Sequence, residues 1–342
     1  MLFTEKCRGL SVRSASGTVT RLFGTAGSSL VASDLFCEGQ SGVNGVAVDP
    51  QFATNRYVYV FMSSNINMNP RTNRVVRLQL DATFSTASNR TDIVSDLRYK
   101  DVANAVGPAG AHSGGRIRFG PDGFLYITTG DNHNPSLPQD LTRLGGKVIR
   151  VDRNGAPAPG NNTPAGGDPR IYTYGHRNVQ GIGFRPSTGQ PYTAEHGPNH
   201  SDEVTPLVAG GNGGWDPENR PNLTCPDNYC GYAGDPTTMP MTDITRFPNA
   251  MRPAWAFTSS AGLGPLVFLN GTQWKAWDGR IAIGVMAAKV LHIIELDAGG
   301  KGIADTMVSS LPANRMRSLV QGPDGSLYIA TDEGEIWRVT PS

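Results

Sequence analysis

The chain has 342 residues, of which 38% are hydrophobic and 17% charged, and its formal net charge is +1. This composition can bury a core and excludes a disordered chain, while the near-neutral charge excludes the basic footprint of a nucleic-acid-binding protein. The sequence has no run of about eighteen apolar residues, which excludes a membrane-spanning helix. Glycine (42 residues) and proline (25 residues) are abundant, and they favour turns over long helices.

Four segments share one plan, in which an alternating apolar stretch is followed by a proline turn and a second apolar stretch that contains tyrosine. They are VAVDPQFATNRYVYVFM from Val46, IRFGPDGFLYITTGD from Ile117, IGFRPSTGQPYTAEHG from Ile182 and LVQGPDGSLYIATDEG from Leu319. Short alternating strands between regular turns predict an all-β fold, and self-similarity at this spacing predicts a β-propeller of four-stranded antiparallel blades. Six blades of about 57 residues fit the length, although the spacing would tolerate five. We therefore predict one propeller domain over residues 1–342.

Two parts of the chain depart from the repeat. The last repeat is complete, but the first begins in its second half, at LFTEKCRGL. Either strands upstream of residue 1 are absent from this chain, or the closure of the ring is unusual. Residues 216–257 lack the repeat and are rich in Pro, Asn and Asp, so we predict a long excursion over the face that carries the site.

The four cysteines and the glycosylation sequons indicate in which cellular compartment the protein folds. Of the three connectivities that four cysteines allow, Cys7–Cys37 with Cys225–Cys230 is the simplest. The second pair lies in a loop without nearby histidines, which favours a disulfide over a zinc site. Sequons occur at Asn89, Asn161, Asn199, Asn222 and Asn270. Paired cysteines and sequons together predict a secreted, glycosylated protein.

Several polar residues occupy loop positions that strand pairing does not need. His112 stands among glycines in GAHSGGRIRFGPDG, although a lone histidine is more often a surface or capping residue. The cations at the entrances of different blades are Arg177, Lys289, Arg315 and Arg317, with Asn178 beside the first. Lys289 falls inside the apolar stretch GVMAAKVLHIIEL, which we expect to be a strand, where a charge needs a partner. One such cation would be a solvated charge, but four predict a pocket for a ligand with several carboxylates or phosphates.

Six motifs, taken in order, resemble those of the soluble quinoprotein sugar dehydrogenases, which are six-bladed propellers that bind pyrroloquinoline quinone (PQQ). They are EGQSGVNGVAVDPQFATNRYVYV, AHSGGRIRFGPDG, LGGKVIRVDRNG, YGHRNVQGIGF, AEHGPNHSDEV with GGNGGW, and NRMRSLVQGPDG. The resemblance extends from Glu38 to the C-terminus. The cysteines and sequons favour the fungal pyranose dehydrogenase branch of this group.

The resemblance implies a cofactor pocket and a catalytic base. PQQ carries three carboxylates, and the positions that match the family's cofactor-binding residues are Arg177, Asn178, Lys289, Arg315 and Arg317. His112 matches the general base, which takes the proton of a sugar's anomeric hydroxyl while hydride passes from that carbon to C5 of the quinone.

The resemblance also implies a calcium site in AEHGPNHSDEV. The main-chain carbonyls of Gly197 and Pro198 match the family's calcium ligands, and calcium there would polarise the quinone carbonyl. Asp202 matches a cofactor-contacting aspartate, Glu203 is expected to brace the loop, and His196 replaces a glutamine that contacts the cofactor. Glycosylation at Asn199 would conflict with this assignment.

The substrate side departs further from the family. Gln40 matches a substrate-side glutamine. The candidates for a second substrate contact are Asp131 first, and then Asn132 and His133. Ala111 and Ser113 flank the histidine where glucose dehydrogenase has Asp and Gln, so glucose specificity does not transfer.

The resemblance predicts a PQQ- and calcium-dependent enzyme that oxidises a pyranose to its lactone. The expected partners are the sugar and an external electron acceptor, such as a cytochrome domain or protein, because this chain has no CxxCH haem motif. We expect a monomer that binds neither nucleic acid nor membrane.

Two alternatives use the same fold. A calcium-dependent lactonase would need carboxylates that converge on the channel, for which Glu195, Asp202 and Glu203 are the candidates. A non-enzymatic extracellular binding propeller would need no base. The cations argue against the lactonase, and the presence of both the cations and the base argues against the binding module.

Overall fold

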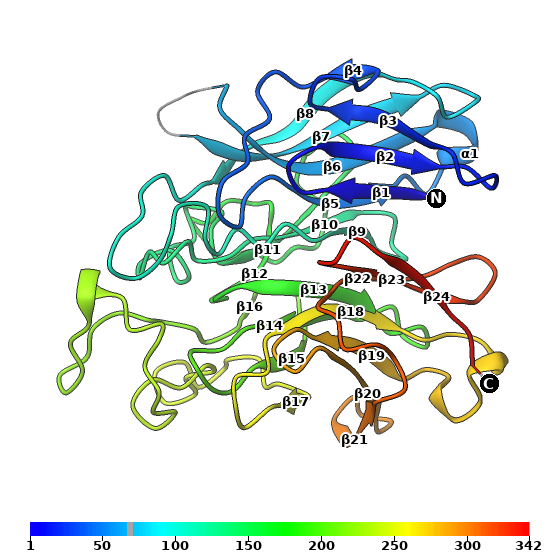
Figure 1. Ribbon diagram of the computed structural model, residues 1–342. Coiled ribbons are helices and arrows are strands. Elements are labelled where there is room, and N and C mark those ends of the chain that lie inside the picture. The colour runs from blue at the N-terminus through cyan, green and yellow to red at the C-terminus, as the bar shows by residue number, and fades with distance from the viewer. Residues whose placement is uncertain (67–70, 342) are drawn as a thin grey trace.

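The structure is a computed structural model that describes residues 1–66 and 71–341. Its strands form six small sheets arranged like blades around a central axis (Figure 1), which confirms the predicted all-β, six-bladed propeller. The short helices lie in the connections: α1 (Phe52–Asn55), η1 (Pro226–Asn228) and η2 (Thr272–Trp277). None of the helices in the described residues is long and apolar enough to cross a membrane.

The first three sheets follow one another along the chain. The first contains β1 (Leu2–Glu5), β2 (Gly9–Arg13), β3 (Val19–Gly24) and β4 (Leu30–Val31). The second contains β5 (Val43–Val48), β6 (Tyr57–Ser64), β7 (Thr72–Leu80) and β8 (Ala87–Arg98). The third contains β9 (Ile117–Phe119), β10 (Leu125–Thr128), β11 (Lys147–Val151), β12 (Ile171–Tyr174) and, at its edge, β16 (Gly211–Asn212).

The remaining three sheets complete the arrangement. The fourth contains β13 (Val179–Phe184), β14 (Pro191–Glu195), β15 (Glu203–Pro206) and β17 (Trp255–Ala256). The fifth contains β18 (Leu263–Phe268), β19 (Ile281–Val285), β20 (Val290–Leu296) and β21 (Gly302–Val308). The sixth contains β22 (Met316–Gln321), β23 (Leu327–Thr331) and β24 (Ile336–Val339).

Some sheets depart from four antiparallel strands. β4 pairs with β3 in parallel, and β16 adds a fifth strand parallel to β12. In the described part of the chain the last sheet has three strands, and β22 and β23 form the last copy of the repeat. β1 runs toward the face at which β5 begins, because the backbone N–H of Val43 donates to the carbonyl of Lys6 at 2.8 Å. β1 therefore has the direction of a second strand, as expected of a repeat that begins in its second half.

The repeated turn has a simple physical basis. Between β9 and β10, Asp122 accepts a hydrogen bond from the hydroxyl of Tyr126 at 2.9 Å, and Gly123 takes a φ of 78° that favours glycine. Between β22 and β23, Asp324 accepts from the hydroxyl of Tyr328, also at 2.9 Å. The shared Asp and Tyr of the repeat therefore close the same turn in two different sheets.

Apolar side chains pack between neighbouring sheets. Tyr59 and Phe61 of β6 meet Ile127 of β10 in the largest cluster, and all three are fully buried. The innermost strands approach closely at glycines, since a Cβ added to Gly45 would lie 2.3 Å from the carbonyl oxygen of Gly115. Burial at these interfaces, at about 25 cal/mol per Å² of apolar surface, holds the sheets around the axis.

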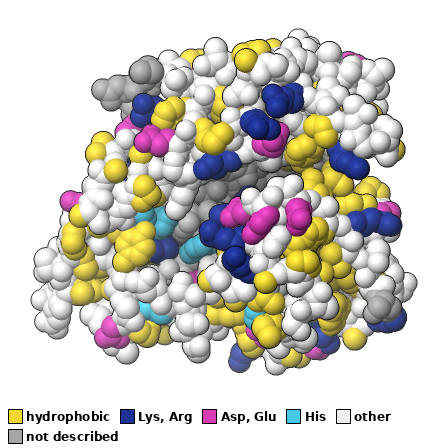
Figure 2. Space-filling model, in the orientation of Figure 1, with side chains coloured by type: hydrophobic (Ala, Val, Ile, Leu, Met, Phe, Trp, Pro, Cys, Tyr) yellow, Lys and Arg dark blue, Asp and Glu magenta, His cyan; other side chains and the backbone are white. Residues whose placement is uncertain are grey.

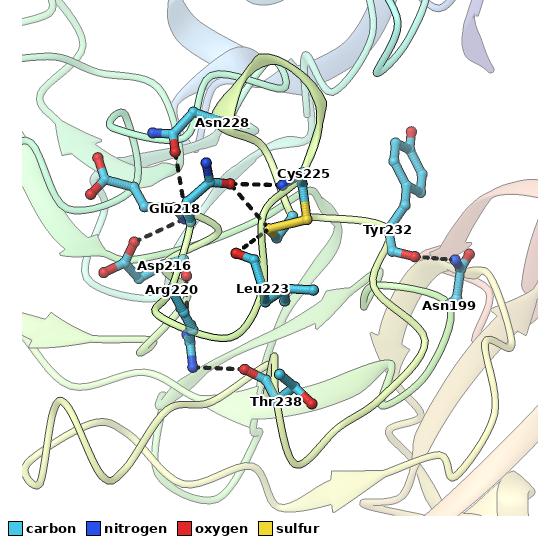
Figure 3. Close-up of a disulfide and its surroundings, with 11 residues drawn as sticks. Asn199, Asp216, Glu218, Arg220, Leu223, Cys225, Asn228, Tyr232 and Thr238 are labelled. Atoms are coloured by element: carbon cyan, nitrogen blue, oxygen red, sulfur yellow. Dashed lines mark hydrogen bonds between the residues drawn. A yellow bond between two sulfur atoms is a disulfide. The ribbon is translucent and has the colours of Figure 1, made fainter.

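The excursion leaves the fourth sheet after β15. Through β16 it follows the edge of the third sheet, and it returns to the fourth sheet at β17. The predicted excursion over residues 216–257 therefore extends too far, because Trp255 and Ala256 form a strand. Both predicted disulfides are present, Cys7–Cys37 and Cys225–Cys230, and the second lies within the excursion (Figure 3).

Candidate active site

Loops from several sheets meet at one face of the propeller. Arg177 precedes the innermost strand of the fourth sheet, and its carbonyl accepts a hydrogen bond at 2.7 Å from the backbone N–H of Asp131, in the loop after β10. Likewise, the N–H of His196 after β14 donates to the carbonyl of Asn178 at 3.3 Å. Figure 2 shows a hollow in the middle of the visible face, with basic, acidic and histidine side chains along its rim.

His112 and Asp131 form a buried pair at the centre of these loops. His112 Nδ1 lies 2.7 Å from Asp131 Oδ1, and the two residues are 5% and 0% exposed. The backbone takes left-handed values at His112 (φ 49°), Asn132 (φ 50°) and His133 (φ 54°). Such values carry strain in residues other than glycine and are often found at functional sites. The fold thus holds this pair in a geometry that local preference does not provide.

Four donors converge on the carboxylate of Asp131. Oδ1 also accepts the backbone N–H of His133 at 2.9 Å, while Oδ2 accepts Trp215 Nε1 and the hydroxyl of Tyr229, each at 2.9 Å. Burial would raise the pKa of Asp131, but His112 and Arg177 outweigh burial and hold that pKa below its usual range. Asp131 is therefore ionised and acts only as an acceptor.

This charge fixes the state of the histidine. Because Asp131 accepts from Nδ1–H, the imidazole of His112 carries its lone pair on Nε2, and among the described residues no hydrogen bond reaches that atom. Burial lowers the pKa of His112, and Asp131 partly opposes that shift. The imidazole is consequently neutral at neutral pH, with an available basic nitrogen.

The excursion completes the wall around this pair. Tyr229 is 2% exposed, and the hydroxyl of Tyr232 lies 2.9 Å from Nε2 of His133. The ring of His133 packs edge-on against that of His112, with centroids 3.9 Å apart. Burial is the main cause that lowers the pKa of His133 to about 3. His133 is therefore a neutral neighbour of the base, held by a tyrosine from the excursion.

Arg177 links the excursion to the fourth sheet. Its Nη2 donates to the carbonyl of Gly231 at 2.7 Å and its Nη1 to the carbonyl of His196 at 3.2 Å, while its cation lies over the ring of Tyr232. The backbone N–H groups of Arg177 and Asn178 both donate to Oε1 of Glu195. Glu195 thereby sets the direction in which these two side chains leave the loop.

The other predicted cations lie on the fifth and sixth sheets. Arg317 makes a two-pronged ion pair with Asp332, at 2.6 and 2.8 Å, and Arg315 lies 3.6 Å from the same carboxylate. The placement of Lys289 inside a strand was wrong. It is exposed in the loop between β19 and β20, with a φ of 56°, because Val285 pairs with Val290 and the intervening residues reverse the chain.

His196 lies within electrostatic range of Arg177 and Arg317, two of the four predicted cations. Burial and then Arg177, His112 and Arg317 lower the pKa of His196 to about 3. Groups from the third, fourth and sixth sheets therefore lie within electrostatic range of one imidazole. Gln40 reaches the same region from the segment before β5, where its Oε1 accepts the backbone N–H of His112 at 3.1 Å.

The loop from His196 to Asp202 is tightly folded. A Cβ added to Gly197 would lie 1.9 Å from the carbonyl oxygen of His200, so only glycine fits there. Asp202 accepts the backbone N–H of Gly197 at 3.0 Å and that of Leu263 at 2.9 Å. Both oxygens of Asp202 thus already have protein partners, and the side chain braces the loop.

This loop can hold calcium only through its carbonyl oxygens. In the described residues no group of three His, Cys, Asp or Glu side chains comes together as a metal site. The carbonyl oxygens of Gly197 and Pro198 accept no hydrogen bond from any residue that the structure describes. Calcium prefers such hard oxygen ligands. The available donors therefore fit the calcium site that the family resemblance implies.

The surroundings of this loop also fit an anionic cofactor. Among the residues that the structure describes, none hydrogen-bonds to the buried Nε2 of His196, which is costly unless a ligand supplies a partner. The cations that could meet carboxylates of such a ligand are Arg177, Lys289, Arg315 and Arg317. PQQ, with three carboxylates, is a chemical match for this set.

Several residues of the site were not predicted from the sequence. Trp215, Tyr229 and Tyr232 lie in or beside the excursion, where no repeat guided the prediction. The GGNGGW motif was a usable signal for Trp215, but nothing in NYCGY distinguished its tyrosines from those of an ordinary loop.

Comparisons with known proteins agree with this geometry. The glucose/sorbosone dehydrogenase family matches residues 1–338. The aldose sugar dehydrogenase YliI of Escherichia coli is 28% identical over 313 residues, with 90% of this chain and 79% of the relative covered. The protein slr1608 of Synechocystis sp. is 30% identical over 327 residues, with 91% and 74% covered. A crystal structure of a glucose dehydrogenase is 28% identical, with a TM-score of 0.82 and coverage of 100% of this chain and 93% of that one.

These matches place the chain among the sugar dehydrogenases, a class of oxidoreductases. Within that class it belongs to the glucose/sorbosone dehydrogenase family, which confirms the family resemblance that the motifs indicated. The predicted leaning to the fungal pyranose dehydrogenase branch stays a prediction.

Proposed function

We propose that the protein is a PQQ- and calcium-dependent dehydrogenase that oxidises a pyranose sugar at the anomeric carbon to the lactone. The observation that carries the proposal is the buried His112–Asp131 pair, which presents a basic nitrogen in the loops that also carry the cation of Arg177. Membership of the family supports the reaction class.

His112 acts as the general base. Asp131 holds Nδ1–H and leaves Nε2 as the acceptor for the anomeric hydroxyl proton. Loss of that proton to Nε2, together with loss of hydride from the same carbon, leaves a carbonyl at that carbon, which is the lactone. The developing imidazolium is stabilised by the ionised carboxylate of Asp131. Bound PQQ supplies the electron-accepting ortho-quinone for this chemistry.

The cations hold and orient the cofactor. Arg177 is buried and fixed by carbonyl groups, so it presents a rigid positive charge. Arg315, Arg317 and Lys289 are more exposed and would neutralise the outer carboxylates of PQQ. Calcium would be held by the carbonyl oxygens of Gly197 and Pro198, and there it supplies a Lewis acid.

Two features support assignments of the other residues. Asn178 is buried beside Arg177, and its Oδ1 accepts from Gln180 at 3.0 Å, which leaves its amide N–H groups for a ligand. Gln40 is exposed beside the backbone of His112, where its amide can meet the sugar.

The hydrogen bonds of the candidate carboxylates do not favour the lactonase alternative. Glu195 is engaged by His176 Nδ1 at 2.9 Å and by backbone N–H groups, and Asp202 by two backbone N–H groups. Glu203 accepts from the hydroxyl of Thr242 at 2.7 Å, and burial raises its pKa to about 8. These acids brace the loops, and among the described residues no group of three His, Cys, Asp or Glu side chains could hold a metal ion.

We also propose that the protein is secreted as a monomer and passes electrons to an external acceptor such as a cytochrome domain. Two disulfides support an oxidising compartment. The side chains of Asn222 and Asn270 are exposed and available for glycosylation, whereas the amide nitrogen of the exposed Asn89 donates to Gln79 at 2.9 Å. The side chain of Asn161 is buried against carbonyl groups, and that of Asn199 donates to the carbonyl of Tyr232, so neither suits a glycan.

A titration tests the proposal. Metal-stripped protein is titrated with PQQ with and without calcium, and the quinone absorbance is followed as individual pyranoses are added. We expect calcium-dependent uptake followed by bleaching with at least one pyranose. Uptake without bleaching by any sugar would reject the reaction, and no uptake at all would reject the cofactor.

A further inference from the structure

The excursion carries two tyrosines whose environments differ. Tyr229 is 2% exposed, and its hydroxyl is committed to Asp131. Tyr232, three residues later, is 45% exposed although its hydroxyl is also bound, by Nε2 of His133 at 2.9 Å. A large aromatic ring that is both exposed and fixed at a site is more typical of a ligand-contacting residue than of a packing residue.

Several contacts fix the position of Tyr232. The Cys225–Cys230 disulfide closes the loop just before it, and Asn199 of the Gly-Pro loop donates to its backbone carbonyl at 2.6 Å. Figure 3 shows the ring projecting away from the disulfide, with Asn199 beside the backbone. A Cβ on Gly231 would lie 2.1 Å from the ring of Tyr229, so this glycine allows the two tyrosines to diverge. These contacts of the loop therefore fix the position of the Tyr232 ring.

The ring of Tyr232 lies beside the proposed general base, His112. Its centroid is 6.4 Å from that of His112 and 5.4 Å from that of His133. The cation of Arg177 lies 5.3 Å from the same centroid. The exposed ring of Tyr232 therefore lies close to the imidazole whose Nε2 would meet a sugar hydroxyl. The cations Arg315 and Arg317 pair instead with Asp332 of the last sheet.

We propose that Tyr232 is a specificity-determining residue whose ring packs against the C–H groups of the pyranose bound at His112. The proposal rests on the proposed sugar dehydrogenase function. A pyranose has apolar patches of axial C–H groups, and aromatic rings in carbohydrate sites pack against such patches while polar groups bind the hydroxyls. Tyr232 then distinguishes sugars by the face that they present, and His133 is a positioning residue that holds the Tyr232 hydroxyl.

The test compares Tyr232→Ala and Tyr232→Phe with the wild-type holoenzyme. We expect Tyr232→Ala to raise KM about fivefold, unequally across a panel of pyranoses, because one packed ring contributes about 1 kcal/mol. Tyr232→Phe keeps the ring and should keep the order of preference among the sugars. Affinity for PQQ, measured separately by titration, should be unchanged in both variants. Tyr328→Ala, at the start of β23, is the control for loss of a tyrosine away from the site.

The outcomes separate this proposal from the function on which it rests. If the wild type oxidises sugars and Tyr232→Ala leaves every KM unchanged, the proposal is overturned while the function stands. If Tyr232→Ala weakens PQQ uptake, the ring belongs to the cofactor pocket and the proposal is likewise wrong. If the wild type takes up PQQ but no pyranose reduces it, the proposed function fails and the assignment of Tyr232 fails with it.

Discussion

Replacement of Asp131 by Asn tests whether this carboxylate sets the state of the base. Oδ1 accepts from His112 and His133, and Oδ2 accepts from Trp215 and Tyr229, so an amide NH₂ must face donors on one side. The Tyr229 hydroxyl can rotate to accept, but the N–H of Trp215 cannot. One or two buried donors are left unpaired, at about 1–3 kcal/mol each, and the melting temperature should fall by about 5–10 °C.

The same substitution removes the charge that stabilises protonated His112. We expect kcat to fall at least about a hundredfold, as for loss of general-base catalysis. Because Asp131 raises the pKa of His112 against the effect of burial, its loss lowers that pKa, and the acid limb of the pH–rate profile should move to lower pH. Steady-state kinetics from pH 4 to 9, with calorimetry for stability, measure both effects.

A matched control exists on the fifth sheet. His292 Nδ1 lies 2.8 Å from Asp305, which is exposed, and Asp305→Asn should change neither kcat nor, by more than about 1 kcal/mol, stability. Wild-type turnover and an unshifted acid limb in Asp131→Asn would refute the reasoning.

Three further changes follow from the structure. His112→Ala should retain PQQ uptake but lose turnover at least about a hundredfold. Single-turnover kinetics equal to those of the wild type would show that His112 is not the general base. Replacement of Arg317 and Lys289 by Ala should weaken PQQ uptake in absorbance titrations, whereas unchanged affinity would place the cofactor elsewhere. Burial raises the pKa of Glu203 to about 8 from its ordinary value of 4.5, so the folded state holds a proton that the unfolded state releases between these values. Stability from this group is complete below pH 4.5 and is lost as pH rises to about 8, with a slope of about 1.4 kcal/mol per pH unit that Glu203→Gln should abolish. An unchanged slope in denaturant titrations would contradict the assigned pKa.

The fold was predictable because its repeat is built from local chemistry. Asp122 and Tyr126 close a turn with hydrogen bonds between residues four apart, and the flanking alternation sets the buried faces. The parallel edge strands β4 and β16 were not predictable, because each has two residues and is defined by a distant partner.

The site was predictable where a residue stands beside a strand of the repeat. His112, Arg177 and Asp131 fall at such positions, and the structure brings them together. Lys289 was assigned to a strand because the sequence around it is apolar throughout, although Val285 and Val290 are the residues that pair.

The residues of the excursion were not predictable for a different reason. Tyr229 and Tyr232 reach the site through the path of a long irregular segment, and that path depends on contacts with Asp131, His133 and Arg177 from two other sheets. No local pattern encodes such a path.

The most direct measurement of the central claim is the product of a single turnover. Protein loaded with PQQ and calcium, without an external acceptor, is mixed with excess pyranose, and the sugar products are identified by mass spectrometry and NMR. The account predicts one lactone, oxidised at the anomeric carbon, for each PQQ bound. Oxidation at another carbon, or reduced PQQ without lactone, would contradict it.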